Sequence, residues 1–327
     1  MKYLFYPGCS MQRNAKSYLD SLLALQDKIG AEFIELDDWN CCGATEYSSV
    51  NRTASHALVG RNLAIAQDMS NGTNTLMAAC SACYLNLQKT DHYMGEDGLF
   101  DERINDALAA GDLHYDAGSL DVRHALDVIF NDVGLENIKK QVVKPLKGLK
   151  VAAYYGCMIV RPDVNNKYGN PEYPNILEEL LSALGAEVVD FPMKTHCCSG
   201  HMTQISGETA YELIRRLAYG ATQYDADMLV TLCPMCQLNI DAYQAETNRF
   251  FNTDYEVPIL YFTQLMGLAF GIDAKDLGIG KEFVDPRPAL AKIGVEVEEE
   301  APVPRRSKKK DEGLPMPKMP GNAGGEN

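Results

Sequence analysis

The ten cysteines of this chain fall into two copies of one five-cysteine pattern. Each copy has a single cysteine, then an adjacent Cys-Cys pair after a gap of 31 or 39 residues, then a C-x-x-C motif after a gap of 37 or 34. The first set is Cys9, Cys41, Cys42, Cys80 and Cys83, and the second is Cys157, Cys197, Cys198, Cys233 and Cys236. The repeat predicts two similar folded units, each of which gathers five thiols.

The repeat extends to the apolar pattern around the cysteines. Each copy opens with a buried-strand pattern, at Lys2–Tyr6 and 150–155, which ends at a glycine directly before the first cysteine. Helical patterns and short strands then alternate. The helical patterns are 17–29, 55–69, 176–184 and 207–223, and the last strands, 75–79 and 228–232, run into the C-x-x-C motifs. The chain is therefore predicted to be an α/β protein with two homologous Rossmann-like βαβαβα halves related by a pseudo-twofold axis, each with its thiols at the carboxyl ends of the strands.

The remaining segments divide the chain into four parts. Residues 1–94 and 149–280 are predicted to be the two cysteine-rich domains. The segment 95–148 contains no cysteine and is predicted to be a helical spacer, with a helix over 121–133. Residues 281–327 are rich in Pro, Glu and Lys toward the end and are predicted to be a disordered tail, because such a segment cannot bury enough apolar surface.

Composition and charge indicate which binding partners and which cellular compartment to expect. The net charge is −15, and the acids and bases balance from residue 281 onward, so the excess lies in the first 280 residues. An acidic body disfavours nucleic acid and anionic membranes as partners. The longest apolar stretch, 259–272, is too short to span a bilayer, and the N-terminus lacks the pattern of a signal peptide. We expect a cytoplasmic protein without membrane insertion, in which cysteines bind metal or do redox work more often than they form disulfides.

The cysteines favour iron–sulfur chemistry over the alternatives. Randomly placed structural cysteines would not pair five to five, and disulfides need an oxidising compartment. Zinc takes four ligands, whereas each set offers five, so zinc in one half remains an alternative. Bridging sulfides let an iron–sulfur cluster use more thiolates than a single ion does. The wide spacing differs from the tight cysteine run of ferredoxins, which indicates an unusual cluster.

The motifs YPGC…CCG…C-x-x-C and YYGC…HCCSGH…CPMC resemble the duplicated cysteine-rich CCG domain of the heterodisulfide reductase B subunit, over about residues 1–275. The resemblance implies a noncubane [4Fe-4S] cluster on each set of cysteines. It implies the coenzyme M–coenzyme B disulfide of methanogenesis as substrate. It also implies two partners from the same complex: the A subunit, which carries flavin and iron–sulfur clusters, and the iron–sulfur C subunit. One departure is visible: Ser199 stands where the motif has glycine.

The resemblance predicts the disulfide-cleaving subunit of a heterodisulfide reductase complex, in which each of two clusters gives one electron and two thiols are released. Partners would deliver the electrons, because the chain has no G-x-G-x-x-G motif, no P-loop and no ferredoxin-type run of cysteines. The alternative is a CCG-domain electron-transfer subunit of another redox complex, of the fumarate or succinate, glycerol-3-phosphate or lactate oxidoreductase type.

Beside the ten cysteines, which are predicted to be cluster ligands at the reaction site, six residues are candidates for supporting roles. His196 and His201 flank the second Cys-Cys pair and are candidate proton donors. The candidates for binding an anionic substrate are Arg13, Lys16, Arg161 and Lys167. The other histidines, among them His124, fall in helical contexts away from the thiols, and we assign them no role.

Overall fold

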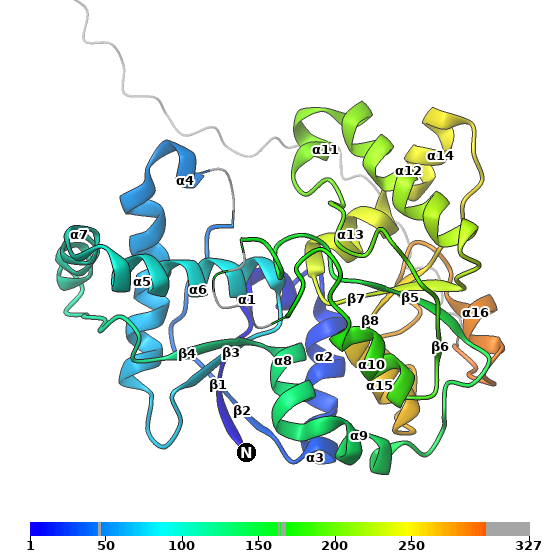
Figure 1. Cartoon of the computed structure of the whole chain (residues 1–327), viewed down its shortest axis with the longest axis horizontal. Helices are drawn as coiled ribbons and strands as arrows, with labels where there is room; N and C mark the ends of the chain where they lie inside the picture. The colour runs from blue at the N-terminus through cyan, green and yellow to red at the C-terminus, as the bar shows by residue number, and fades with distance from the viewer. Residues whose placement is uncertain (45–46, 163, 165–167, 299–327) are drawn as a thin grey trace, which may run out of the picture.

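The computed structural model describes residues 1–44, 47–162, 164 and 168–298, which form two α/β halves that lie side by side (Figure 1). Each half is built on a four-stranded parallel sheet. The strand orders, β2-β1-β3-β4 and β6-β5-β7-β8, are the same when the second half is read from its own first strand. The predicted class, a duplicated α/β protein, is therefore confirmed.

The first half and the segment that follows it run from β1 to α9. The elements are β1 (Lys2–Tyr6), α1 (Gly8–Met11), α2 (Lys16–Ala24), α3 (Gln26–Ile29), β2 (Glu32–Glu35), α4 (Tyr47–Val50), α5 (Arg52–Asp68), β3 (Thr75–Ala78), α6 (Ser81–Glu96), α7 (Gly98–Ala109), β4 (Asp121–His124), α8 (Ala125–Val128), the π-helix η1 (Ile129–Gly134) and α9 (Leu135–Gln141).

The second half repeats the order of the first. Its elements are β5 (Lys150–Tyr154), α10 (Ile176–Ala183), β6 (Glu187–Val188), α11 (Met202–Ile205), α12 (Gly207–Gln223), β7 (Met228–Thr231), α13 (Pro234–Ala242), α14 (Gln244–Phe251), β8 (Ile259–Tyr261), α15 (Phe262–Ala269) and α16 (Arg287–Ala291).

The inner strands are apolar because helices cover both faces of each sheet. After Lys2, every residue of β1 is buried, and so is every residue of β7. Such continuous burial is typical of parallel strands. One apolar core runs through both halves, and α2 of the first half packs on α15 of the second. The halves therefore form one folded body.

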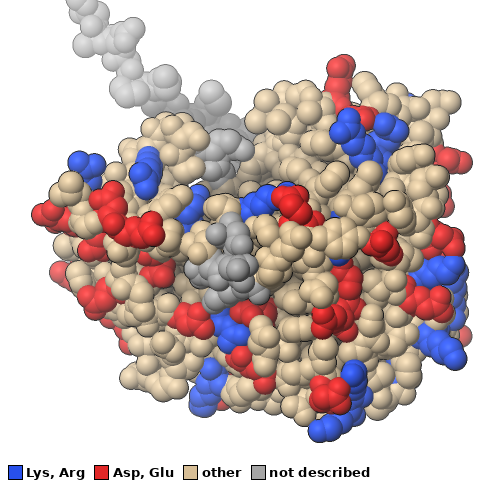
Figure 2. Space-filling model, viewed as in Figure 1, with Lys and Arg blue, Asp and Glu red and all other residues tan. Residues whose placement is uncertain are grey.

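Charged side chains are scattered over the outside of this body. On the face in Figure 2, acidic side chains occur over both halves, with Lys and Arg between them. On this face the acidic side chains are not gathered in one region.

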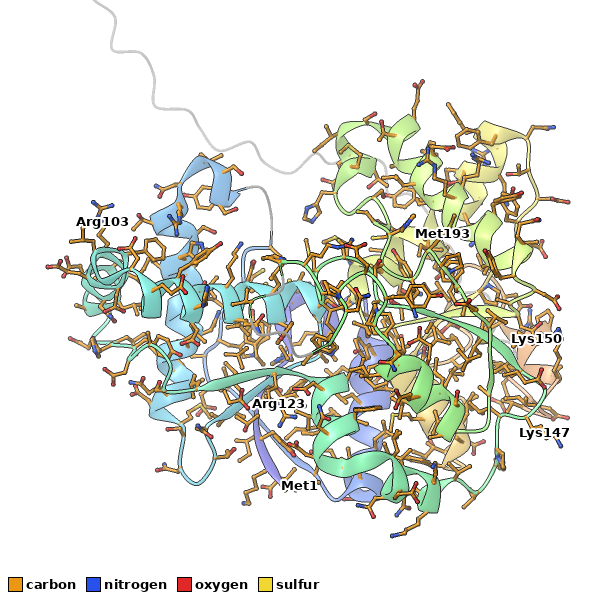
Figure 3. The ribbon with its side chains drawn as sticks, in the orientation of Figure 1. Met1, Arg103, Arg123, Lys147, Lys150 and Met193 are labelled. Carbon is orange, nitrogen blue, oxygen red and sulfur yellow. The ribbon has the colours of Figure 1, made fainter. Side chains whose placement is uncertain are left out.

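The direction of the strands brings the cysteines together. In Figure 3, Met1 lies at the lower edge, where β1 begins, and Lys150 lies at the right edge, where β5 begins. Both strands run from these edges toward the middle of the molecule, beside α1 (Figure 1). The register places the end of β1 level with that of β3, and the end of β5 level with that of β7, since Tyr6 pairs with Ala78 and Tyr154 with Thr231.

Two sequence predictions need correction. The predicted helix over 121–133 begins instead as strand β4, and each sheet has a fourth strand, β4 or β8, that the three-strand pattern lacked. In β4, charged Asp121 and Arg123 alternate with buried Val122 and His124, and four residues are too few for the alternation to stand out from the helical pattern that follows.

The predicted tail is folded over its first part. Residues 281–298 include helix α16, whose Leu290 and Ala289 are buried against the body. This short apolar segment packs on a core that the second half already provides, so it does not have to fold alone. The rest of the predicted tail, 299–327, lies outside the described residues.

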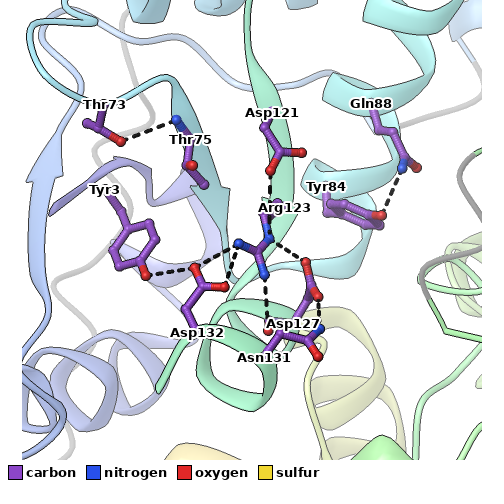
Figure 4. Close-up of polar contacts among 10 residues, drawn as sticks. All are labelled: Tyr3, Thr73, Thr75, Tyr84, Gln88, Asp121, Arg123, Asp127, Asn131 and Asp132. Carbon is purple, nitrogen blue, oxygen red and sulfur yellow. Dashed lines mark hydrogen bonds and ion pairs between the residues drawn. The ribbon is translucent and has the colours of Figure 1, made fainter. Parts of the chain in front are cut away.

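Arg123 anchors β4 to the rest of the first half (Figure 4). Its Nε donates to Asp127 at 2.6 Å, and its Nη1 donates to Asp132 at 2.7 Å. Asp132 also accepts a hydrogen bond of 2.8 Å from the hydroxyl of Tyr3, which belongs to β1. Asp127 is buried, so its charge depends on this arginine.

We predict that Arg123→Met lowers the free energy of unfolding by about 3 kcal/mol, because it leaves the buried Asp127 carboxylate without its cation. A fully buried pair would cost more, but Arg123 is partly exposed. Urea unfolding of the full chain measures the change. Lys2→Met is the control: it removes an exposed ion pair with Glu32 and should cost less than about 1 kcal/mol. Equal effects of the two substitutions would contradict the structural role of Arg123.

Candidate metal centre

The five sulfurs of the first set form one connected group. Cys9 Sγ lies 3.4 Å from Cys41 Sγ, and Cys42 Sγ lies 3.3 Å from Cys83 Sγ. Cys80 lies beside Cys83, close enough for the Cys83 thiol to shift its pKa. The single cysteine after β1, the loop pair and the C-x-x-C motif before α6 are thus brought to one place, as the positions of the strand ends require.

The second set repeats this arrangement. Cys157 lies beside Cys197, Cys198 beside Cys236, and Cys236 beside Cys233, close enough for each neighbour to shift the pKa of the other. Each of these pairs corresponds to a pair in the first set when the cysteine motifs of the two halves are aligned. The duplication seen in the sequence is therefore a duplication of side-chain arrangement.

The two sets also touch each other. The Cys80 and Cys233 thiols, the first cysteines of the two C-x-x-C motifs, lie close together across the boundary between the halves, and each shifts the pKa of the other. We call this boundary the seam, defined by Ala79, Cys80, Leu232 and Cys233. All ten sulfurs consequently belong to one region of the molecule.

A glycine directly before the first cysteine makes room for each set. Gly8 and Gly156 have φ of +73° and +68°, a backbone conformation that other residues adopt at a cost. A Cβ at Gly8 would lie 2.8 Å from Cys83 Sγ, and one at Gly156 would lie 2.8 Å from Cys236 Sγ. Only glycine lets the strand end approach the C-x-x-C sulfur this closely.

Matching polar side chains that the sequence analysis missed hold the Cys-Cys loops. Tyr6 donates to the carbonyl of Asn40 at 2.7 Å, and Tyr154 donates to that of His196 at 2.8 Å. Asn86 and Asn239 hold the loops from the other side. Asn86 donates to the Cys42 carbonyl at 2.9 Å. Both asparagines stand three residues after a C-x-x-C motif, so this repeat was a signal in the sequence.

Ser199 takes the same left-handed conformation as its counterpart Gly43, with φ of +85° against +62°. Asn239 supports this strained turn, because its Nδ2 donates to the Gly200 carbonyl at 2.7 Å and lies 3.4 Å from Ser199 Oγ. The departure from the glycine motif therefore leaves the loop geometry in place.

The sulfurs differ in exposure and in acidity. Cys9, Cys41 and Cys197 are exposed and Cys157 is half-buried, whereas the other six are buried. Hydrogen bonds from the neighbouring thiols lower the pKa of Cys41 and of Cys197, with Cys42 contributing most in the first case and Cys157 in the second. Each set therefore has one side open to solvent and a sulfur that readily becomes a thiolate, the form that binds metal.

Cys80 and Cys233 are the N-cap residues of α6 and α13, where the partial positive charge of a helix N-terminus favours a thiolate. At Cys80 the neighbouring Cys233 thiol and burial outweigh this effect and raise the pKa well above its usual value. At Cys233, the neighbouring Cys236 and Cys80 thiols and the amides of α13 hold the pKa well below its usual value.

The donor set fits an iron–sulfur cofactor. Each set brings five thiols together. Within the described residues, His, Cys, Asp and Glu side chains form no group of three that could hold one metal ion. Each set is a chain of paired sulfurs, and thiolates spread in this way suit a cofactor with several irons, in which different cysteines bind different irons.

The predicted supporting residues lie in different surroundings. His196 is exposed beside Cys197, and His201 is half-buried at the start of α11. Arg161 forms an ion pair with Glu172, and Lys16 lies 3.8 Å from Asp20. Arg13 is exposed, and Lys167 lies outside the described residues. Their predicted roles in proton transfer and anion binding stay predictions.

A small cavity of about 180 Å³ lies between the halves, next to the second set. Ser10 and Asn14 line it from the first half, and His201, Met235 and Asn239 line it from the second. The lining contains hydroxyl, amide and imidazole groups but no Lys or Arg among the described residues. The described lining therefore mixes polar and apolar side chains and contains no carboxylate.

Taken together, the two sheets and the ten paired sulfurs define a duplicated cysteine-rich α/β protein. The family model for the cysteine-rich CCG domain matches the chain twice, at residues 3–88 and 151–241. The chain belongs to this family, and its predicted resemblance to the heterodisulfide reductase B subunit is confirmed.

Similar proteins extend over nearly the whole chain. The 8-methylmenaquinol:fumarate reductase membrane anchor subunit of Wolinella succinogenes is 32% identical over 87% of this chain and 97% of that protein. The B subunit of the ferredoxin:CoB-CoM heterodisulfide reductase of Methanosarcina mazei is 30% identical over 89% and 97%. A protein of Archaeoglobus profundus, described as similar to the heterodisulfide reductase B subunit, is 29% identical over 89% and 97%.

One solved structure has the same fold. It is a hypothetical protein from Helicobacter pylori, which matches 87% of this chain with a TM-score of 0.67 at 14% identity. This chain spans about half of that protein, 52% of its length. None of the helices in the described ranges is long and apolar enough to cross a bilayer.

We predict that Gly8→Ala and Gly156→Ala each reduce the iron content of the anaerobically purified chain by about half, because the added Cβ displaces a C-x-x-C sulfur in one half. Iron and acid-labile sulfide assays measure the loss. Gly30→Ala is the matched control, since Gly30 also has a positive φ of +64° but has open space around it. An unchanged iron content in both site variants would contradict the predicted binding sites.

Proposed function

We propose that this chain is the disulfide-cleaving subunit of a heterodisulfide reductase complex. Its ten cysteines would hold two noncubane [4Fe-4S] clusters, five thiolates to each, and the substrate would be the coenzyme M–coenzyme B disulfide. The A and C subunits of such a complex would deliver the electrons. The similarity to heterodisulfide reductase B subunits over 97% of their length supports this proposal.

The single observation that carries the proposal is the meeting of the two sets at the seam. Two equivalent sets of thiols lie close together at Cys80 and Cys233, and each set also has a sulfur exposed at the surface. In the proposed reaction one disulfide reaches both sets at once. A simple electron relay has no need of two equivalent sites.

The reaction converts one disulfide, two electrons and two protons into two thiols. Bound clusters would supply the electrons, one from each site. The chain's own residues bind and orient the substrate and supply protons. The cavity between α1 and α13 would receive one end of the substrate, and His201, which lines it, would hold a proton for the thiolate that leaves.

We predict that Cys42→Ala and Cys198→Ala each abolish cleavage of the coenzyme M–coenzyme B disulfide. Both substitutions remove a sulfur that contacts a C-x-x-C cysteine, so each disables one of two sites that are needed together. The measurement is thiol release with a reduced viologen dye as electron donor. Leu99→Ala, an exposed change on α7, serves as control and should retain activity. Full activity in either cysteine variant would contradict the two-site scheme.

The second candidate function is electron transfer within another redox complex, of the fumarate reductase type. Two observations favour it: the Wolinella succinogenes relative is 32% identical, and the cavity next to the second set has no basic residue for an anionic substrate among the described residues. In addition, Arg161 and Lys16 are already engaged with carboxylates.

A single anaerobic titration distinguishes the two functions. If the chain cleaves the disulfide, adding coenzyme M–coenzyme B disulfide to the reduced protein releases two thiols and reoxidises the bound clusters. If the chain only transfers electrons, the clusters stay reduced and no thiol appears until a partner acceptor is added. The second result would overturn the first proposal.

A further inference from the structure

The two halves meet at the carbonyl groups that directly precede the C-x-x-C motifs. These carbonyls belong to Ala79, after β3, and Leu232, after β7. The hydroxyl of Tyr18 lies 3.0 Å from the Ala79 oxygen and 3.3 Å from the Leu232 oxygen. One side chain from α2 therefore spans the seam and contacts both halves at equivalent points.

Tyr18 is held rigidly in this position. Its side chain is fully buried, and its ring stacks on Tyr261 with 4.2 Å between centroids and 5° between planes. The ring of Phe262 packs against the same ring in a T-shaped arrangement, with 6.1 Å between centroids. Burial raises the pKa of Tyr18 well above its usual value, so the phenol keeps its proton and remains a hydrogen-bond donor.

Other donors point at the same pair of carbonyls. Ser81 Oγ lies 3.5 Å from the Leu232 oxygen, across the seam. His124 lies at the end of β4, fully buried, and its Nδ1 accepts a hydrogen bond from the Leu126 amide, so a neutral ring carries its proton on Nε2. The ring faces the Ala79 and Leu232 carbonyls, although Nε2 completes no hydrogen bond within the described part of the chain.

The position of His124 corrects the sequence analysis, which put it in a helical context away from the thiols. It stands at the end of β4 and pairs with Ala78 of β3. Ala78 lies two residues before Cys80, so His124 is close to the first C-x-x-C motif. In the second half, Tyr261 occupies the matching place, opposite Thr231. The two halves thus place different side chains, an imidazole and a phenol, at equivalent points beside the seam.

We propose that Tyr18 is a positioning residue that fixes the two C-x-x-C motifs relative to each other. Cys80 and Cys233 each follow a carbonyl that its hydroxyl contacts, and the two thiols contact each other. A shift of either carbonyl therefore changes the separation of the two sets of sulfurs. The link to catalysis rests on the proposed function, in which both sites must reach one disulfide bond at the same time.

The test is Tyr18→Phe in the full chain, purified anaerobically with whatever cofactor it binds. The variant keeps the ring and its stack on Tyr261 but loses the hydroxyl. Hydrogen–deuterium exchange should become about three- to tenfold faster in peptides that cover 79–84 and also in those that cover 232–237, as the loss of one net hydrogen bond predicts. Unchanged exchange in 232–237 would overturn the proposal.

A spectroscopic readout separates positioning from general stability. In the reduced chain, the EPR spectrum of Tyr18→Phe should differ from that of the wild type, because the separation of the two sites changes. Ser21→Ala is the matched control: it removes a 2.7 Å bond to Thr263, also from α2 to the second half, without touching either carbonyl. An equal change in Ser21→Ala would overturn the specific role of Tyr18.

Tyr115→Phe controls for the loss of a buried phenol, since its hydroxyl bonds to Asp91 within the first half. This substitution should leave the exchange rates of the peptides that cover 79–84 and 232–237, and the EPR spectrum, unchanged. The exchange experiment does not depend on iron. A chain that binds no iron–sulfur cluster would therefore refute the proposed function, while the exchange data would still decide the role of Tyr18.

Discussion

The sharp turn at the end of the first strand of each half is the constraint on which both sites depend. Gly8 and Gly156 each stand two residues after the end of their strand, with a positive φ and no Cβ, so the backbone comes within contact of the C-x-x-C sulfur. The single cysteine of each set follows directly. Parallel strands with equal register then bring the other thiols to the same edge. A larger side chain at this turn would force the strand end and the sulfur apart.

The parts outside the cysteine motifs keep these edges in place. The fourth strand of each sheet ends beside the C-x-x-C strand, and in the first half the ion pairs of Arg123 tie that strand to β1 through Asp132 and Tyr3. Packing of α2 on α15 then joins the halves, and Tyr18 lies in that interface. The seam between the two sets is therefore supported by both sheets and by the helices between them.

Much of this could be predicted from the sequence, because thiols are rare and their spacing repeats. The strands that precede Cys9 and Cys157 and the helix Gly207–Gln223 have strong apolar patterns, and the structure has them where these patterns predict. The fourth strands could not be predicted, since β4 and β8 are short and one carries charges. Tyr18 gave no signal either: its hydroxyl reaches carbonyls 61 and 214 residues away, and only tertiary structure brings these together.

The central claim is that two equivalent sets of five cysteines each hold an iron–sulfur cluster. The most direct measurement is the iron, acid-labile sulfide and zinc content of the anaerobically purified chain, with Mössbauer spectroscopy of the bound iron. Two four-iron clusters predict about eight irons and eight sulfides per chain, with no zinc. About four irons together with one zinc, or zinc without sulfide, would contradict the equivalence of the two halves.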